Sequence, residues 1–291
     1  MREGPLRSFQ VCRILTGRTC LRWLLLLIRL VVVSSICTMA SGSLTCHHAD
    51  LLGRRHESPA LRYFVVWAVF IMLVTGGGAT HVDIACDPEL VRLAIALTSL
   101  PVCVSSVDPA AFVAAVEAGA LMVEIGNYDS FYETGVVFSP DQILNLTKET
   151  RRILPSMPLS VTVPHTLGLP DQVKLAELLE QEGADIIQTE GGKCSNPSAS
   201  GVLGLIEKAA PTLASAYSIS RAVKIPVMCS SGLSAVTAPM AITAGAAGVG
   251  VGSAINKLND VVAMIAEVKN IADSLKLPSQ LDVRKERSLN L

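Results

Sequence analysis

The sequence predicts an α/β fold, a TIM-type (β/α)8 barrel whose first strand is atypical or missing. Three observations predict it. The chain has 291 residues, enough for one barrel of about 250 residues. From residue 78 onward, seven short β-type segments alternate with helical segments, which implies parallel strands joined by right-handed crossovers. The strands also belong to two alternating classes, which a layered barrel interior explains and an open doubly wound sheet does not.

The two classes differ in how each strand begins. Strands of the first class follow a Gly-Ala pair, and the residues five positions after the glycine are Asp83, Glu124, Gln188 and Gly250. Strands of the second class follow a proline, and the residues four positions later are Ser105, Thr162 and Ser230. Because side chains alternate between the two faces of a strand, we expect both sets to point into the barrel and the aliphatic residues between them to face the helices.

The elements follow from these patterns in chain order. The expected strands are 80–85, 102–107, 121–126, 159–163, 185–189, 227–230 and 248–251. The expected helices are 88–99, 108–118, 139–154, 170–182, 201–223, 235–244 and 259–275. Three helices begin with a capping side chain directly before a first-turn proline, at Asp87-Pro88, Asp108-Pro109 and Ser139-Pro140. The eighth strand would come first, near or before residue 66.

The front of the chain differs in composition from the rest. Hydrophobic residues make up 50% of the chain and charged residues only 17%, so some segment is unusually apolar. Residues 1–79 hold nine Arg, no Lys and three acidic residues, whereas the remaining 212 residues carry a net charge of −7. We therefore expect an Arg-rich apolar leader over 1–75, a barrel domain over 76–277 and a polar tail over 278–291.

Several interpretations of the leader stay open. A basic start and an apolar run from Trp23 to Ala40 are typical of a secretory signal, whereas an Arg-rich, acid-poor segment is typical of a plastid or mitochondrial transit peptide. A membrane anchor would carry Arg29 in its middle, at a cost of ~2.5–3.5 kcal/mol. A further interpretation is that this front segment comes from an incorrectly assembled gene and is not part of the natural protein. A second apolar run, Tyr63–Val74, is short for a bilayer and is expected to be a buried helix, or a strand over Tyr63–Val66 followed by a helix.

Charge and cysteine usage argue against several classes of protein. The net charge of −1 lacks the basic surface of a nucleic-acid binder, so we expect no nucleic-acid partner, and membrane contact only if the leader is retained. The cysteines after the leader lie far apart without CxxC spacing, so we expect buried thiols and no metal site. Nothing in the sequence indicates a cofactor or an oligomeric state.

The inward-facing polar residues are the catalytic candidates. Asp83, Glu124 and Gln188 are costly to bury without partners. They form either a hydrogen-bonded plug or the floor of a site at the carboxyl ends of the strands, where barrel enzymes keep their chemistry. In a site, two close carboxylates suit a general acid and base, or bind a hard divalent cation. His165 and Glu190 follow neighbouring strands and are further catalytic candidates, with His165 and Gln188 orienting the substrate; a structural role for His165 is the alternative.

The last two strands end in small residues that are typical of a phosphate site. Gly232 and Ser234 follow one strand, and Gly252 and Ser253 follow the next. Such residues let backbone N–H groups approach a phosphate near a short helix N-terminus; glycine required for helix–strand packing is the alternative. No Lys lies within an expected strand, which argues against a Schiff-base aldolase.

These motifs resemble the hypothetical chloroplast reading frame 23 family of plastids and cyanobacteria. The matching segments are Gly77–Ala85, Glu124–Phe131, Ser160–Thr166, Gln188–Gly192 and Gly248–Asn259. The resemblance covers about residues 77–275, and before residue 77 the family's usual first strand is not recognisable. It implies a barrel of the phosphate-binding type in the plastid stroma, and it supplies no reaction.

Two hypotheses about function follow. In the first, the protein is an enzyme that acts on a small phosphorylated metabolite by proton transfer, isomerisation or lysis, with Asp83 and Glu124 as acid and base. In the second, it is a non-catalytic barrel that binds a phosphorylated ligand and reports it to a partner.

Overall fold

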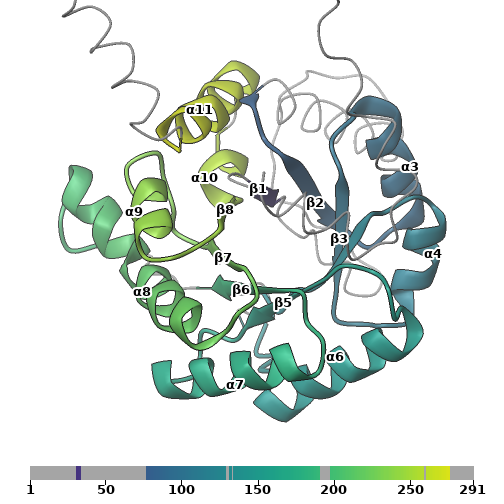
Figure 1. The fold of residues 1–291 in the computed structure, drawn as a ribbon. Coiled ribbons are helices and arrows are strands. Elements are labelled where there is room, and N and C mark those ends of the chain that lie inside the picture. Colours follow the sequence, from purple (N-terminus) through teal and green to yellow (C-terminus); the bar gives the residue numbers. More distant parts are fainter. Residues whose placement is uncertain are drawn as a thin grey trace, which may run out of the picture.

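A computed structural model of the chain describes residues 31–33, 77–128, 131–132, 134–190, 197–258 and 260–275. Eight parallel strands are hydrogen-bonded to one another in chain order and close into a barrel, with helices around the outside (Figure 1). The predicted α/β barrel is thus confirmed. No helix among the described residues is long and apolar enough to span a bilayer.

The elements alternate along the chain as predicted. The strands are β1 (Val31–Val33), β2 (His81–Ala85), β3 (Val102–Ser106), β4 (Met122–Ile125), β5 (Leu159–Val163), β6 (Ile186–Glu190), β7 (Val227–Ser230) and β8 (Gly248–Val251). The helices are α3 (Pro88–Leu97), α4 (Ala111–Glu117), α6 (Pro140–Ile153), α7 (Leu169–Gln181), α8 (Gly201–Ala222), α9 (Ala238–Thr243), α10 (Ser253–Asn256) and α11 (Val261–Ser274).

Two helices start three residues later than expected, because side chains close turns ahead of them. Asp108 Oδ1 accepts the Ala110 amide at 3.0 Å, so the chain turns before α4 begins. Before α9, the Thr237 hydroxyl accepts the Ser234 amide at 2.9 Å. The predicted caps at Asp87 and Ser139 are present, and each accepts backbone amides at the start of its helix.

The first strand is the atypical one. β1 has three residues and pairs with β2 on one side, Val32 opposite Val82, and with β8 on the other, Val31 opposite Gly250. It lies inside the range assigned to the leader and inside its apolar run. The run Tyr63–Val74, considered for this strand, lies outside the described residues.

Three of the four Gly-Ala pairs are helix ends that turn the chain into the next strand. Gly119, Gly183 and Gly245 all have positive φ angles, 95–114°. In each case the alanine amide bonds back to a carbonyl five residues earlier, as in a Schellman motif. The repeat therefore sets where each helix stops and the following strand begins.

The aliphatic residues between the inward-facing positions form the core. Val82, Ile84, Val123, Ile125 and Ile187 are 0–1% exposed and belong to one cluster of strand and helix residues. Burying each such side chain contributes roughly 1.5–3 kcal/mol. This placement leaves the polar residues of the same strands facing the interior, as the alternation predicts.

Candidate functional site

The barrel interior contains a cluster of hydrogen-bonded polar residues around two carboxylates, which we call the carboxylate cluster. Asp83 on β2, Glu124 on β4 and Gln188 on β6 are 1–3% exposed. The cluster is completed by hydroxyl-bearing side chains from β3, β5 and the segment after β4: Ser105, Ser160, Thr162 and Tyr128. Ser105 and Thr162 were expected in this interior; Ser160 and Tyr128 were not.

Glu124 accepts hydrogen bonds on both of its carboxylate oxygens. Ser160 Oγ donates to Oε2 at 2.7 Å. Gln188 Nε2 donates to Oε1 at 2.8 Å, and the Tyr128 hydroxyl also donates to Oε1. Thr162 Oγ1 lies 3.5 Å from the same oxygen. These donors stabilise the ionised form of Glu124.

Tyr128 connects the two carboxyl groups. Its hydroxyl lies 3.0 Å from Asp83 Oδ2 and 2.9 Å from Ser105 Oγ, and Ser105 Oγ lies 2.7 Å from both Asp83 oxygens. Gly126 makes room for the tyrosine ring, because a Cβ at this glycine would lie 2.4 Å from a ring carbon. The sequence carried a signal for Tyr128, a phenol four residues after Glu124 at a strand end.

Burial dominates the titration of these groups. It raises the pKa of Asp83 well above the ordinary value, and the charge of Glu124 raises it further. Burial also raises the pKa of Glu124, while hydrogen bonds from its four partners lower it. The pKa of Tyr128 is raised by burial and by the two carboxylates, so the phenol stays protonated. Among the described residues, no three His, Cys, Asp or Glu side chains gather as a metal site.

A second group of side chains, the rim cluster, connects to the carboxylate cluster through Thr162. His165 Nδ1 after β5 lies 3.5 Å from Glu190 Oε2 at the end of β6. The edge of the Tyr132 ring packs against the imidazole at 4.6 Å between centroids. The Tyr132 hydroxyl donates to Asn127 Oδ1 at 2.9 Å, and Asn127 Nδ2 donates to the Thr162 carbonyl. The structure thus brings His165 and Glu190, both named as catalytic candidates from the sequence, close together.

The ends of β7 and β8 come together at the same end of the barrel. Ser230 pairs with Gly250, so the turn Ser231–Ser234 and the residues Gly252 and Ser253 follow adjacent strands. Ser231 and Gly232 have φ angles of 77° and 71°. We call these two segments the phosphate turns, after the ligand that the sequence predicts for them. The Ser234 amide already donates to Thr237, so its backbone N–H is not a free donor.

Two buried polar atoms lie on β6 and at the end of β7, where one of the phosphate turns begins. Gln188 and Ser230 are 1% and 8% exposed, and within the described part of the chain Gln188 Oε1 and Ser230 Oγ make no hydrogen bond. The amide orientation is set, since Nε2 donates to Glu124. Both residues face the interior on neighbouring strands, and Ser230 pairs with Gly250, which has no side chain. Buried polar atoms normally have partners, so Gln188 Oε1 and Ser230 Oγ are candidates for contact with a ligand. His81 Nε2, at the opposite end of the barrel, is likewise buried without a hydrogen-bond partner among the described residues.

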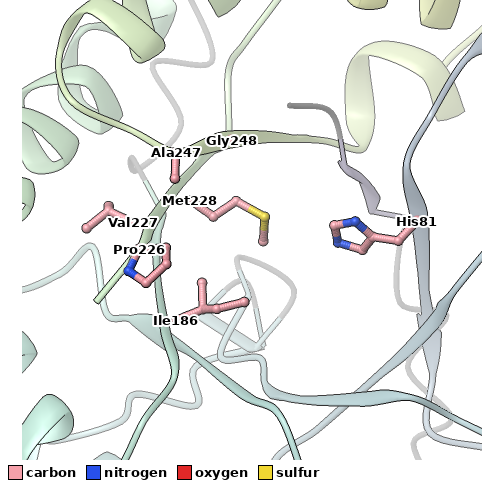
Figure 2. Close-up of a pocket in the computed structure, with 7 residues that line it drawn as sticks. All are labelled: His81, Ile186, Pro226, Val227, Met228, Ala247 and Gly248. Atoms are coloured by element: carbon pink, nitrogen blue, oxygen red, sulfur yellow. The ribbon is translucent and has the colours of Figure 1, made fainter. Parts of the chain in front are cut away.

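A recess at the opposite end of the barrel contains His81 and belongs to no predicted site. Its lining comes from the starts of strands and includes Ile186, Met228 and Gly248; Figure 2 shows the His81 ring facing Met228. Burial lowers the pKa of His81 to about 4, so the imidazole is neutral. Because this end of a barrel contributes to stability, we assign His81 a structural role.

Comparison with known proteins places the chain in a family. A family described as "Protein of unknown function (DUF561)" matches residues 66–280. "Uncharacterized protein ycf23" of Cyanophora paradoxa is 41% identical over 204 residues, covering 70% of this chain and 84% of the relative. The chain belongs to the ycf23 family. The ycf23 protein of Porphyra purpurea is 38% identical over 192 residues, covering 66% of this chain and 72% of the relative. The predicted family is confirmed.

Solved structures share the ycf23-family fold at low sequence identity. 3-Hexulose-6-phosphate synthase has a TM-score of 0.54 at 14% identity, covering 85% of this chain and 99% of that chain. Thiamine phosphate pyrophosphorylase from Pyrococcus furiosus has a TM-score of 0.53 at 17% identity, covering 87% of this chain and 98% of that chain. A TM-score of 0.52 at 12% identity is found for (S)-3-O-geranylgeranylglyceryl phosphate synthase from Thermoplasma acidophilum in complex with sn-glycerol-1-phosphate. This similarity covers 86% of this chain and 93% of that chain. These similarities establish the barrel fold.

Proposed function

We propose that this barrel binds a small phosphorylated metabolite at the phosphate turns and acts on it by proton transfer, as an isomerase or lyase. The observation that carries the proposal is the pair of buried polar atoms, Gln188 Oε1 on β6 and Ser230 Oγ at the end of β7, where one of these turns begins. An amide oxygen accepts only, and a serine hydroxyl donates or accepts. Together they suit a hydroxyl group of a ligand.

The phosphate would occupy the ends of β7 and β8. Gly232 packs against the Lys208 carbonyl of α8, as the packing alternative expected, and its φ angle shapes the turn, while glycine at 252 lets backbone N–H groups approach an anion. The register brings both segments to one place. All three solved structures described above carry a phosphate compound in their names, which supports the same ligand class. Ser253 begins α10 directly after the second of these segments, and in the first segment Ser234 Oγ lies 3.2 Å from Thr237 Oγ1.

The rest of the ligand would extend toward the carboxylate cluster. Gln188 is the link, because its Nε2 donates to Glu124 while its Oε1 is directed elsewhere. In this arrangement Asp83 and Glu124 supply an acid and a base, and His165 and Glu190 orient the ligand from the rim. We place the protein in the plastid stroma, in line with its ycf23 relatives in Porphyra purpurea and Cyanophora paradoxa.

A non-catalytic barrel that binds a phosphorylated ligand is the second candidate. One observation favours it: both carboxylates are 1–3% exposed and Glu124 accepts hydrogen bonds on both oxygens, as a structural plug would. Ligand binding without turnover would select this candidate. Binding is therefore the claim to test first.

Calorimetric titration with inorganic phosphate and glycerol phosphate tests it. We expect Gly252→Asp to abolish binding, because a carboxylate there repels the anion and takes the space of its oxygens. Gly135→Asp is the matched control, since it adds the same charge in a loop with open space around it, after β4 and so across the barrel. Equal affinity of both variants, each with wild-type circular dichroism, would refute the phosphate site.

A further inference from the structure

The contacts of Tyr128 leave one hydrogen to be assigned. Its hydroxyl is hydrogen-bonded to Glu124 Oε1 and lies 3.0 Å from Asp83 Oδ2. A phenol has one hydrogen and donates it to one carboxylate at a time. The contact with the other carboxyl needs a second hydrogen, because two acceptor oxygens facing each other in a buried site are unfavourable.

The donors around Glu124 identify which carboxyl carries that hydrogen. Ser160 donates to one oxygen of Glu124 and Gln188 to the other. A hydrogen on Glu124 would face these donor hydrogens, so in the ligand-free protein Glu124 is the ionised member of the pair, and it carries a hydrogen only transiently during a reaction. Asp83 then carries the hydrogen on the oxygen that faces Tyr128.

We propose that at neutral pH Asp83 is a neutral carboxylic acid that donates to the Tyr128 oxygen, while Tyr128 donates to the ionised Glu124. The described titratable groups facing Asp83 are Glu124 on β4, Tyr128 after β4, Cys103 on β3 and Cys86 after β2. Glu124 is the only one of them that is charged at neutral pH, and its charge favours the neutral acid. Hydrogen bonds from Ser105, Tyr128 and Cys103 act in the opposite direction, but burial is the largest effect and also favours the neutral form. Burial and then the charge of Glu124 raise the pKa of Asp83, which agrees with a neutral Asp83.

This arrangement deepens the proposed function, on which the following step rests. It holds an acid and a base side by side at one pH, which suits a phosphorylated substrate with a hydrogen on the carbon next to a carbonyl. Glu124 takes that hydrogen as a proton, the electron pair of the C–H bond moves toward the carbonyl oxygen, and Asp83 gives its proton to that oxygen. The pair is restored when Glu124 passes its proton to the Tyr128 oxygen and the Tyr128 proton passes to Asp83. Tyr128 is thus a positioning residue that resets the pair.

Carbon-13 NMR of the full chain, labelled at Asp and Glu carboxyl carbons and free of ligand, tests the assignment. At pH 7 we expect the Asp83 signal at the position of a protonated carboxyl and the Glu124 signal at that of a carboxylate. An ionised Asp83, or a protonated Glu124, would overturn the proposal. Because no ligand is present, failure of phosphate binding in calorimetry and failure of this assignment are separate results.

Two amide variants provide an independent measurement. In Asp83→Asn the amide N–H replaces the acid hydrogen as the donor to Tyr128, so we expect a Tm within about 2 °C of the wild type. In Glu124→Gln an amide donor meets the donors that surround Glu124, so we expect the Tm to fall by at least about 4 °C. Equal falls in the two variants would contradict unequal protonation of the pair.

Discussion

Gly232 allows a prediction about the first phosphate turn, because its surroundings exclude any side chain. A Cβ at this position would lie 2.5 Å from the backbone oxygen of Lys208 in α8 and 3.1 Å from its carbonyl carbon. The φ angle of 71° adds the cost of a left-handed conformation, about 1–2 kcal/mol for a residue with a side chain. Relief of the contact requires the turn to move away from α8.

Gly201→Ala is the matched control for Gly232→Ala. Gly201 has a φ angle of 63°, and a Cβ there meets nothing within 4 Å. The control therefore loses about 1–2 kcal/mol of unfolding free energy from the backbone conformation alone. Gly232→Ala loses that amount plus about 1–3 kcal/mol from the forced shift of the turn.

Urea unfolding and phosphate calorimetry of the two variants provide the assay. We expect Gly232→Ala to be the less stable variant and to bind inorganic phosphate at least about tenfold more weakly than the wild type, a loss of about 1.4 kcal/mol. Gly201→Ala should keep wild-type affinity. Equal unfolding free energies for the two variants, or wild-type affinity in folded Gly232→Ala, would refute the assignment of this turn.

Three further predictions address other parts of the barrel. Gly126→Ala should displace the Tyr128 ring and lower the unfolding free energy by about 1–3 kcal/mol. Ultraviolet titration should then show the phenol pKa lowered toward its ordinary value. An unchanged titration would contradict the packing of the ring on this glycine. His81 has a folded-state pKa of about 4, below its unfolded value. The neutral imidazole therefore contributes its full share to the unfolding free energy above pH 6.5, and roughly 3 kcal/mol of that free energy is lost as the pH falls to 4. In His81→Leu, urea unfolding should show a correspondingly smaller fall in unfolding free energy between pH 6.5 and pH 4. A fall equal to that of the wild type would show that His81 is not its source. Arg151→Ala should lower the unfolding free energy by about 2–4 kcal/mol, because the guanidinium binds Asp185 at 2.7 Å and several backbone carbonyls before β5 and β6. Calorimetry should give an unchanged phosphate affinity for this variant. A weaker affinity would mean that the two ends of the barrel are coupled.

Most of the barrel could be predicted because local chemistry repeats along the chain. The Gly-Ala helix ends and the period-two alternation gave seven strands, and they placed Asp83, Glu124 and Gln188 in one interior layer. The first strand could not be located in the same way. Val31–Val33 lies in an apolar run, and a buried parallel strand, a signal segment and a buried helix look alike in such a run.

The candidate site was predicted in part for a similar reason. Strand positions follow from periodicity, so the inward-facing acids and the pairing of the phosphate turns were expected. Tyr128 and Tyr132 lie in the connection after β4, where no period applies, and their contacts depend on the path of that connection. The use of the Ser234 amide by Thr237 was equally unpredictable, since it depends on the geometry of a turn.

The most direct test of the central claim is an NMR titration of backbone amides in the full chain with glycerol phosphate, with glycerol as the unphosphorylated control. We predict that glycerol phosphate shifts the amides of Ser231–Ser234 and Gly252–Ser253, which follow the paired ends of β7 and β8, and that glycerol leaves them in place. Shifts confined to the other end of the barrel, around His81 and Gly248, or no shifts at all, would contradict a phosphate site at these turns.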